Sequence, residues 1–328
     1  MQSWPDIFSK FNNLTVLIIG DVMVDAYIWG AVERLSPEAP VPIINVKKRS
    51  FRLGGAANVA LNVLALGAKP VLCALVGQDE NGKRLLQLME ENGMSKEGIV
   101  MTASRPTTVK ARVIAADQHV VRVDDESDAI ATPQEEKELQ NRIEKLLPTS
   151  HVVIFEDYDK GVITPTLIAH SVKLAKAQGI PTVVDPKKRN FLHYESVTLF
   201  KPNLKELREG LKIDIDAKDQ LSVSQAVDQI KKKLTVEGVM LTLSDQGVFI
   251  DYQNEKLKLA AHTRAIADVS GAGDTVISIA ALCVALKLSS KKIGALSNLG
   301  GGLVCQHVGV VPIDKEELLR EAVEMKNG

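Results

Sequence analysis

Short apolar segments alternate with amphipathic segments along most of this chain, and this alternation constrains the fold more than any other feature. The short segments are typical of strands buried on both faces, whereas the longer ones have apolar residues at helical spacing. Repetition of this order predicts an α/β fold with a doubly wound, mostly parallel sheet. The predicted strands are 14–19, 70–76, 151–155, 181–184, 197–200 and 238–243, and the predicted helices are 54–66, 80–92, 133–147, 164–178, 204–210, 222–234, 276–286, 291–307 and 314–325.

Two stretches interrupt the alternation. Residues 26–51 combine aromatic and β-branched residues with three prolines, which argue for exposed or edge strands rather than a helix. In residues 107–124, valines alternate with charged residues, a pattern typical of strands with one polar face. We expect the two stretches to form a small sheet that stands off the main body and covers a site. The chain would then be one domain, 1–328, with this lid inserted.

Composition excludes several classes of protein. The 40 basic and 41 acidic residues give a net charge of −1, so neither a nucleic-acid footprint nor an acidic tail is present. Three widely separated cysteines in apolar segments indicate buried thiols in a reducing compartment. There is no secretory signal pattern, and the run 276–286 is shorter than the roughly 20 residues that cross a bilayer. We expect a cytoplasmic protein with no membrane or nucleic-acid partner.

A glycine-rich motif, Gly271-Ala272-Gly273-Asp274, directly precedes the apolar helix 276–286. The two glycines permit a tight turn that a ligand can approach closely. Free amides of Gly271, Ala272 and Gly273 at a helix N-terminus suit a phosphate in transfer. Asp274 could be only a charge partner for the helix dipole. Alternatively, it is a general base that takes a proton from a substrate hydroxyl during phosphoryl transfer.

A second group of polar residues suits a polyol. Gly54 and Gly55 open a predicted helix, either as a structural turn or as backbone that a sugar approaches closely, with Asn58 offering a donor and an acceptor. Asp21 and Asp25 follow the first predicted strand. They could be cap or turn residues, or a carboxylate pair that accepts hydrogen bonds from two sugar hydroxyls.

Asn203 and Glu206 have the spacing of a helix capping box. They could equally lie near the magnesium ion that a nucleotide reaction needs. Lys187 follows a buried strand in Asp185-Pro186-Lys187, where a simple turn is an adequate alternative to a functional role.

Further candidates come from two other connections. Ser244 and Gly247 lie in the turn of a predicted hairpin, where Gly247 would take a positive φ, and we place both with Lys187 among the cofactor-binding candidates. Asp157 follows another predicted strand and is a substrate-binding candidate. The chain contains no G-x-x-x-x-G-K-[ST] motif and no G-x-G-x-x-G after the first strand, which argues against a P-loop and against a Rossmann oxidoreductase. The six histidines lack metal-ligand spacing.

The order of these motifs resembles the ribokinase-like (phosphofructokinase-B) carbohydrate kinase family over nearly the whole chain. Within that family, the chain is most similar to the D-glycero-β-D-manno-heptose-7-phosphate kinases that form one half of bifunctional enzymes. The phrases that carry this likeness are Gly20-Asp21-Val22-Met23, Leu35-Ser36-Pro37-Glu38-Ala39-Pro40-Val41-Pro42, Gly54-Gly55-Ala56-Ala57-Asn58 and Asp157-Tyr158-x-Lys160-Gly161.

The resemblance implies an enzyme that uses ATP and Mg²⁺ to phosphorylate the anomeric hydroxyl of D-glycero-D-manno-heptose 7-phosphate, giving the 1,7-bisphosphate for lipopolysaccharide precursors. Asp274 would be the catalytic base and residues 271–273 the anion hole. Asn203 and Glu206 would organise Mg²⁺ through water, while Asp25, Gly54, Gly55 and Asn58 would hold sugar hydroxyls. A monovalent cation and a homodimer formed through the lid strands are further expectations, and no nucleotidyl-transferase half is expected.

Some residues depart from the family pattern. Val269-Ser270 stands in place of the usual Thr-Thr, and Phe155-Glu156 replaces a small polar pair. A phosphorylated substrate needs cations at its far end, for which Lys110 and Arg112 are candidates, with Arg34 near in sequence; simple exposed basic residues are the alternative. Two other functions stay open: a kinase for another sugar, sugar phosphate or nucleoside, and a non-catalytic sugar-binding or regulatory protein.

Overall fold

A mostly parallel sheet forms the centre of the computed structural model, which describes residues 2–115, 118–262 and 264–325. The sheet confirms the predicted doubly wound α/β fold, and only its last two strands run antiparallel to their neighbours. Across the described residues its nine strands lie in the order β13 (Glu255–Leu259), β12 (Val248–Tyr252), β11 (Gly238–Thr242), β10 (Leu199–Phe200), β9 (Thr182–Asp185), β8 (Val152–Glu156), β1 (Thr15–Gly20), β4 (Lys69–Gly77) and β5 (Ile99–Thr102).

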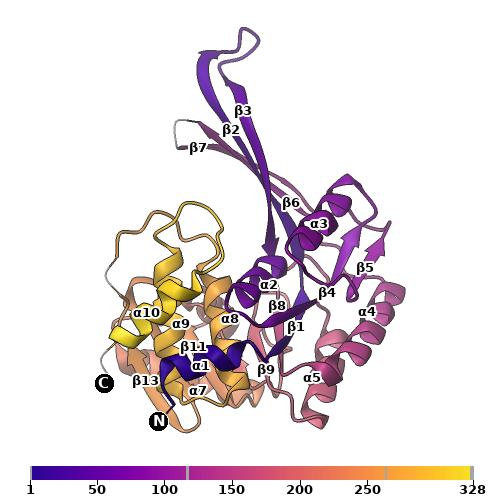
Figure 1. Ribbon diagram of the computed structural model, residues 1–328. Coiled ribbons are helices and arrows are strands. Elements are labelled where there is room, and N and C mark those ends of the chain that lie inside the picture. The colour runs from indigo at the N-terminus through magenta and orange to yellow at the C-terminus, as the bar shows by residue number, and fades with distance from the viewer. Residues whose placement is uncertain (1, 116–117, 263, 326–328) are drawn as a thin grey trace.

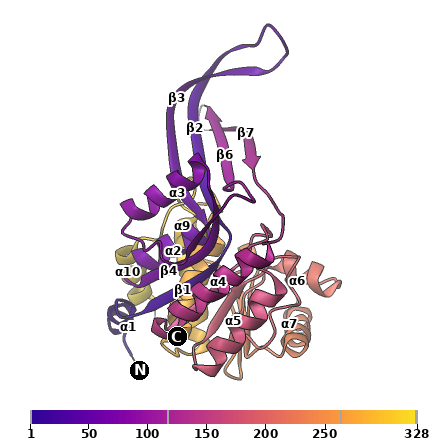
Figure 2. The same ribbon diagram turned by 90° about the vertical axis from the view of Figure 1, so that its right-hand side faces the viewer.

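Helices cover both faces of this sheet (Figures 1 and 2). Alternate residues of β1 enter two separate cores: Val16 and Ile18 enter one, while Leu17 and Ile19 enter the other. The first core is covered by α1 (Trp4–Phe11), α2 (Ala56–Ala65), α3 (Glu80–Glu91), α8 (Ala272–Ala285), α9 (Ser290–Val304) and α10 (Lys315–Glu324). The second is covered by α4 (Pro133–Leu146), α5 (Pro165–Ala177), α6 (Leu204–Leu211) and α7 (Gln220–Leu234), and two short 3₁₀ helices span Leu147–Thr149 and Ser244–Gln246.

Helix α8 is apolar on almost every side, which is the pattern of a helix enclosed by other elements. It packs against α2, α9 and the sheet. Two glycines of α9 allow the close approach, because a Cβ on Gly301 would lie 2.7 Å from Val276 and one on Gly300 would collide with Ile279. This packing fixes where α8 begins, at the carboxyl ends of the parallel strands.

A second sheet rises from the body (Figure 1). This lid sheet contains, in order, β3 (Pro42–Gly55), β2 (Val22–Leu35), β6 (Val109–Ala115) and β7 (Gln118–Asp125). β2 runs parallel to β6, and the other two pairs are antiparallel. Both interruptions in the alternation therefore form strands of one separate sheet. The strands extend beyond the expected limits, so Asp25 lies within β2 rather than in a turn.

Sequence periodicity missed two strands at the edges of the main sheet. β5 is only four residues long, and β13 carries charged residues on one face. The expected strand 197–200 is paired only at Leu199 and Phe200. The predicted hairpin is confirmed: β11 and β12 are antiparallel, and Gly247 has a φ of +83°. Within the described part of the chain, no helix has both the length and the hydrophobicity required to cross a membrane.

Replacement of Ile277 by Ala tests the packing of α8. Ile277 is fully buried in the first core, so Ile277→Ala should lower the free energy of unfolding by about 2–5 kcal/mol. Val323→Ala is the control, because Val323 on α10 is 56% exposed. Urea denaturation followed by circular dichroism measures both variants, and an equal loss in the two would contradict the assigned packing.

Candidate active site

Asp274 lies in the first turn of α8, and both of its carboxylate oxygens accept hydrogen bonds from distant segments. The side-chain amide of Asn58, on α2, donates to Oδ2 at 2.6 Å. The hydroxyl of Tyr158, in the loop after β8, donates to Oδ1 at 2.8 Å. Asp274 is 5% exposed, so its carboxylate is held away from solvent at the carboxyl edge of the sheet.

The pKa of Asp274 is raised to about 6. Burial is the main cause, because it disfavours the charged form, and it outweighs the hydrogen bonds from Asn58 and Tyr158 that favour that form. A carboxylate with this pKa is largely ionised at neutral pH and is a stronger base than an exposed aspartate. Its position and pKa suit a general base.

The amides around the start of α8 differ from the expected set. Gly271 has a φ of +81°, which accounts for a glycine at the N-cap. The Ala272 amide donates to the Val269 carbonyl at 3.3 Å and is therefore not free for an anion. Within the described residues no acceptor lies in hydrogen-bonding range of the amides of Gly271, Gly273 and Asp274. Of the three amides expected to form an anion hole, those of Gly271 and Gly273 thus have no partner in the part of the chain that the structure describes, and neither does the Asp274 amide; their binding of an anion stays a prediction.

A polar network ties α2 to α8 behind this turn. The Asn62 side chain accepts hydrogen bonds from the Thr275 hydroxyl at 2.9 Å and from the Ile313 amide at 3.0 Å. Its own amide group donates to the Asn58 carbonyl at 2.9 Å. The side-chain oxygen of Asn58 is buried with no partner among the described residues. Asn58 is therefore held from behind and keeps one acceptor available for a ligand.

Acidic and basic side chains meet beside the start of α8. Glu156 and Asp185 are register partners at the ends of β8 and β9. Lys201 is 3% exposed, and its ammonium group lies 2.7 Å from Asp185 Oδ2. A Cβ placed on Gly273 would lie 3.6 Å from Asp185 Oδ2 and 3.9 Å from Lys201 Nζ. The glycine turn therefore faces this charged cluster directly.

Glu156 is the unusual member of that cluster. It is fully buried, and neither carboxylate oxygen has a partner among the described residues. Burial, followed by the charges of Asp185 and Asp274, raises the pKa of Glu156 well above its usual range. For Asp185 the charges of Lys201 and Lys187 outweigh burial and lower the pKa. Burial beside two other carboxylates thus disfavours the charged form of Glu156, and a cation bound beside it would favour that form.

The capping interpretation of Asn203 and Glu206 is confirmed. The Asn203 side chain accepts from the Glu206 amide at 2.8 Å, and Glu206 Oε2 accepts from the Asn203 amide at 2.8 Å. The second oxygen of Glu206 accepts from Lys187 Nζ at 2.6 Å, and Lys187 lies 3.6 Å from Asp185. These three residues are therefore joined to the charged cluster, although their binding of phosphate or metal stays a prediction.

Asp21 and Asp157 have structural partners. Asp21 accepts from the amides of Tyr158 at 2.9 Å, Lys160 at 3.1 Å and Val162 at 3.1 Å. Burial, followed by the charge of Asp157, raises the pKa of Asp21 to about 6. Asp21 thus shapes the loop that presents Tyr158. The Asp157 carboxylate accepts from Asn190 and Tyr194 on the far side of that loop. Sugar binding by either residue stays a prediction.

Asp25 lies at the base of the lid sheet and forms an ion pair with Arg112 of β6. The two glycines nearby are required by contacts within the protein. A Cβ on Gly54 would collide with the Asp25 carboxylate, and one on Gly55, where φ is +58°, would collide with the Asp21 carbonyl. Packing therefore explains both glycines without a ligand, and their predicted contact with a sugar stays untested.

The remaining candidates are spread around the site. Lys110 of β6 forms ion pairs with Asp124 and Glu126, both at 3.0 Å. Arg34 is exposed near the outer end of β2. Ser244 begins the short helix after β11 and Gly247 follows it, where a Cβ on Gly247 would lie 2.6 Å from the Ala261 amide. None of these four contacts Asp274.

Sequence reasoning missed three residues of the site: Tyr158, Glu156 and Lys201. Tyr158 and Glu156 follow a predicted strand, where polar residues commonly serve a function, so their place in the chain was a usable signal. Lys201 lies two residues before the capping box, and the capping pattern alone accounts for this stretch of the sequence. A lysine next to a buried strand and an N-cap carries no separate signal in the sequence.

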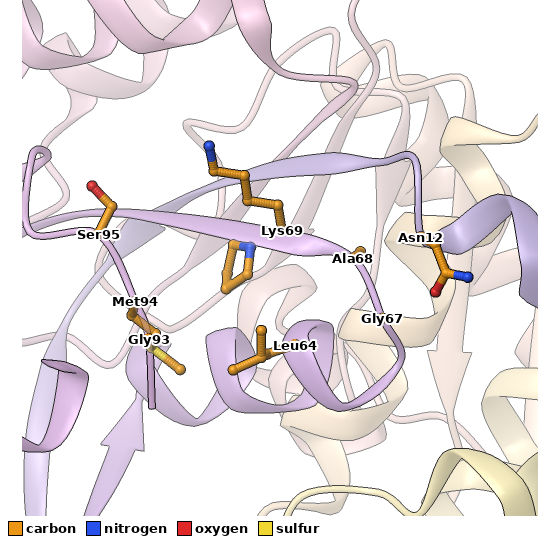
Figure 3. A pocket seen from close by; sticks show the side chains of 9 residues that line it. Asn12, Leu64, Gly67, Ala68, Lys69, Gly93, Met94 and Ser95 are labelled. Carbon is orange, nitrogen blue, oxygen red and sulfur yellow. The ribbon is translucent and has the colours of Figure 1, made fainter. Parts of the chain in front are cut away.

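A hollow of ≈ 410 Å³ lies elsewhere and contains none of these residues (Figure 3). It is found where β1 and β4 begin, at the opposite edge of the sheet from Asp274. Its polar side chains are few, and that of Asn12 already accepts a hydrogen bond from Lys315 at 2.9 Å. The lining residues are Asn12, Leu64, Gly67, Ala68, Lys69, Pro70, Gly93, Met94 and Ser95. None of the candidate residues at the carboxyl edge of the sheet therefore lines this hollow.

Solved structures with the same fold include phosphofructokinase-2 from Escherichia coli in complex with potassium, with a TM-score of 0.79 at 16% identity over 95% of this chain and 98% of that one. Ribokinase from Arabidopsis thaliana complexed with ribose and ATP has a TM-score of 0.71 at 19% identity, over 94% and 99%. These likenesses establish a ribokinase-like fold.

Similar proteins by sequence include the bifunctional protein HldE of Wolinella succinogenes, 38% identical over 92% of this chain. That of Caulobacter vibrioides is 40% identical over 94%. The chain spans 63% of the length of each of these relatives. The family model described as pfkB family carbohydrate kinase matches residues 13–316. With the glycine turn, the buried aspartate and the lid sheet in place, this match shows that the chain belongs to the pfkB family of carbohydrate kinases.

Proposed function

We propose that this protein is an ATP-dependent kinase that phosphorylates the anomeric hydroxyl of D-glycero-D-manno-heptose 7-phosphate. The product would be the 1,7-bisphosphate, a precursor for lipopolysaccharide or other surface glycans. The observation that carries the proposal is the Asp274 carboxylate, which is buried, oriented by Asn58 and Tyr158, and placed beside free amides at the start of α8. The likeness to HldE proteins supports the choice of a heptose phosphate over other sugars.

In the proposed reaction, Asp274 removes the proton from the acceptor hydroxyl as that oxygen attacks the γ-phosphorus of ATP. The amides of Gly271 and Gly273, together with the positive end of α8, stabilise negative charge on the transferring group. Asn58 and Tyr158 hold the carboxylate in the orientation needed for proton transfer. Asp25, Gly54, Gly55 and the free side-chain oxygen of Asn58 would bind sugar hydroxyls.

The nucleotide phosphates would lie on the other side of the turn, against Lys187 and Lys201, with Ser244 and Gly247 beside the nucleoside. Glu156, Asp185 and Glu206 carry the oxygen ligands that Mg²⁺ prefers, although Asp185 and Glu206 are already paired with Lys201 and Lys187. In the described ranges no three His, Cys, Asp or Glu side chains form a metal site, which suits an ion held mainly by phosphates and water, with Asn203 and Glu206 acting indirectly. When bound, the ion neutralises phosphate charge.

Two further features belong to the proposal. A monovalent cation near the glycine turn would support the anion hole; the related fold of Escherichia coli phosphofructokinase-2 has been solved in complex with potassium. A homodimer would form through the lid sheet. Its outer strand β7 exposes Val121 and Val123 at 51% and 56%, and Leu35 at the tip of β2 is 62% exposed. Exposed apolar residues that lie together are typical of a surface that another protein surface covers.

The proposed reaction is tested directly by incubating the protein with ATP, Mg²⁺ and heptose 7-phosphate and analysing the products by mass spectrometry. The heptose 1,7-bisphosphate and ADP should form in equal amounts. ADP release with a different sugar in a substrate panel, and none with heptose 7-phosphate, would contradict the substrate. Sugar binding in a calorimeter without ADP release from any sugar would instead indicate a non-catalytic binding protein.

Asp274→Asn should reduce kcat by about 10²–10⁴, because it removes the base and keeps the shape of the side chain. Binding of ATP and sugar, measured by calorimetry, should change little. Val323→Ala is the control for handling and folding. Turnover at the wild-type rate in Asp274→Asn would refute the role of this residue.

The pH profile gives an independent test of the base. Because the folded pKa of Asp274 is raised to about 6, kcat/KM should fall as the pH drops below about 6, where the carboxylate becomes protonated. Tyr158→Phe removes a hydrogen bond that lowers this pKa, so it should move the acid limb to higher pH. The backbone amide that Tyr158 gives to Asp21 remains, so a titration of Asp21 would not move. An unchanged acid limb would exclude Asp274 as its source.

The dimer is tested by the double variant Val121→Lys with Val123→Lys. If β7 lies in the interface, this variant should be monomeric by light scattering while the wild type is a dimer, because two buried charges would oppose association. Val323→Lys, on the exposed side of α10, should leave the dimer intact. A wild-type monomer, or a double variant that still dimerises, would contradict the lid interface.

A further inference from the structure

The carboxylate of Glu126 bridges two lysines that come from different parts of the molecule. Glu126 follows β7, at the start of the coil that leads to α4. Its Oε2 accepts from Lys110 Nζ at 3.0 Å, and its Oε1 accepts from Lys160 Nζ at 2.6 Å. Lys110 belongs to the lid sheet, whereas Lys160 lies in the body, in the loop after β8. One acidic side chain therefore occupies a point between two converging cations.

More cations hold the same coil. Arg189 donates to the Asp128 carbonyl at 2.9 Å and lies 3.5 Å from the Asp128 carboxylate. Arg105 donates to the Ala129 carbonyl. Lys110 and Lys160 are only 16% and 17% exposed, so they would repel each other strongly without an anion between them. The two lysines therefore share one carboxylate, and the two arginines hold the coil that carries it.

These two lysines adjoin the residues that we assign to the sugar. Lys110 is the register partner of Asp25 across β2 and β6. The Lys160 amide donates to Asp21, which also fixes the Tyr158 amide, and the Tyr158 hydroxyl contacts Asp274. The nucleotide candidates Lys187 and Lys201 belong to a separate cluster, around Asp185. The lysine pair is thus connected to the sugar side of the site.

We propose that Lys110 and Lys160 bind the phosphate that the acceptor sugar already carries, and that Glu126 fills this subsite until the phosphate displaces it. The inference rests on the proposed function, since it presumes a phosphorylated acceptor. A phosphate dianion has more charge and more acceptor oxygens than one carboxylate, so it competes well for two ammonium groups. Glu126 can leave, because it is 28% exposed and lies on a coil. Asp124 keeps a contact with Lys110 at 3.0 Å and holds it in place.

If the Glu126 salt bridges had only a structural role, removal of Glu126 would have the opposite effect on substrate binding. If Glu126 only held the lid to the body, its removal would weaken substrate binding. If Glu126 competes with the substrate, its removal should strengthen binding of a phosphorylated ligand, because a larger fraction of the protein is then ready to bind it. The two interpretations predict opposite changes in substrate affinity, so one variant distinguishes them.

The experiment compares Glu126→Gln, Lys160→Met and the control Glu138→Gln, which changes a carboxylate that pairs with Arg142 on the exposed side of α4. For heptose 7-phosphate, Glu126→Gln should lower KM by about 3–10-fold, as expected when a self-competing state is removed. Lys160→Met should raise that KM by about 10-fold or more, as loss of a charged phosphate contact does. The KM for unphosphorylated heptose and all constants of Glu138→Gln should stay at wild-type values.

Binding of inorganic phosphate, followed by ³¹P NMR line broadening, provides a readout that needs no turnover. Glu126→Gln should bind phosphate more tightly than the wild type, and Lys160→Met should lose binding. A weaker phosphate affinity or a higher KM in Glu126→Gln would overturn the inference, as would equal changes for the phosphorylated and unphosphorylated sugars. Absence of turnover in the wild type with intact phosphate binding would contradict the proposed function and leave the subsite standing.

Discussion

The buried carboxylate of Asp274 is the group on which the rest of the arrangement depends. A charged oxygen in a dry setting is costly unless donors surround it, and here both donors come from far away in the sequence. Asn58 is 216 residues distant and Tyr158 is 116 residues distant. The doubly wound sheet brings them together, because α2, the loop after β8 and the start of α8 all meet at the carboxyl edge. The geometry around Asp274 therefore depends on the whole fold and not on one motif.

Charge is distributed unevenly around this carboxylate. On the side proposed for the nucleotide, Lys201 and Lys187 pair with Asp185 and Glu206, while Glu156 has no partner among the described residues. On the side proposed for the sugar, Lys110 and Lys160 pair with acidic residues of the lid and of the coil that follows it. Each side therefore has two lysines that are paired with carboxylates of the protein. A metal nucleotide and an anionic sugar suit these two sides respectively.

The sequence allowed much of this architecture to be predicted, because local periodicity reports burial. The alternation of strands and helices, the buried helix after Asp274 and the hairpin at Gly247 are all local patterns, and the structure contains them. Contacts across the fold are a different matter. Nothing local indicates that the Tyr158 hydroxyl reaches Asp274, 116 residues away, or that the Asn58 side chain does so from α2. The same limit explains why Gly54 and Gly55, predicted to allow a sugar close, turn out to be required by contacts with Asp25 and Asp21.

In the proposed reaction, the free amides at the start of α8 and the Asp274 carboxylate face the same transferring phosphoryl group. A crystal structure with Mg²⁺, a non-hydrolysable ATP analogue and heptose 7-phosphate tests this arrangement most directly. We expect the γ-phosphate to accept hydrogen bonds from the Gly271 or Gly273 amides while the anomeric hydroxyl contacts Asp274. A triphosphate bound away from this turn, or a sugar whose reacting hydroxyl contacts another base, would contradict it.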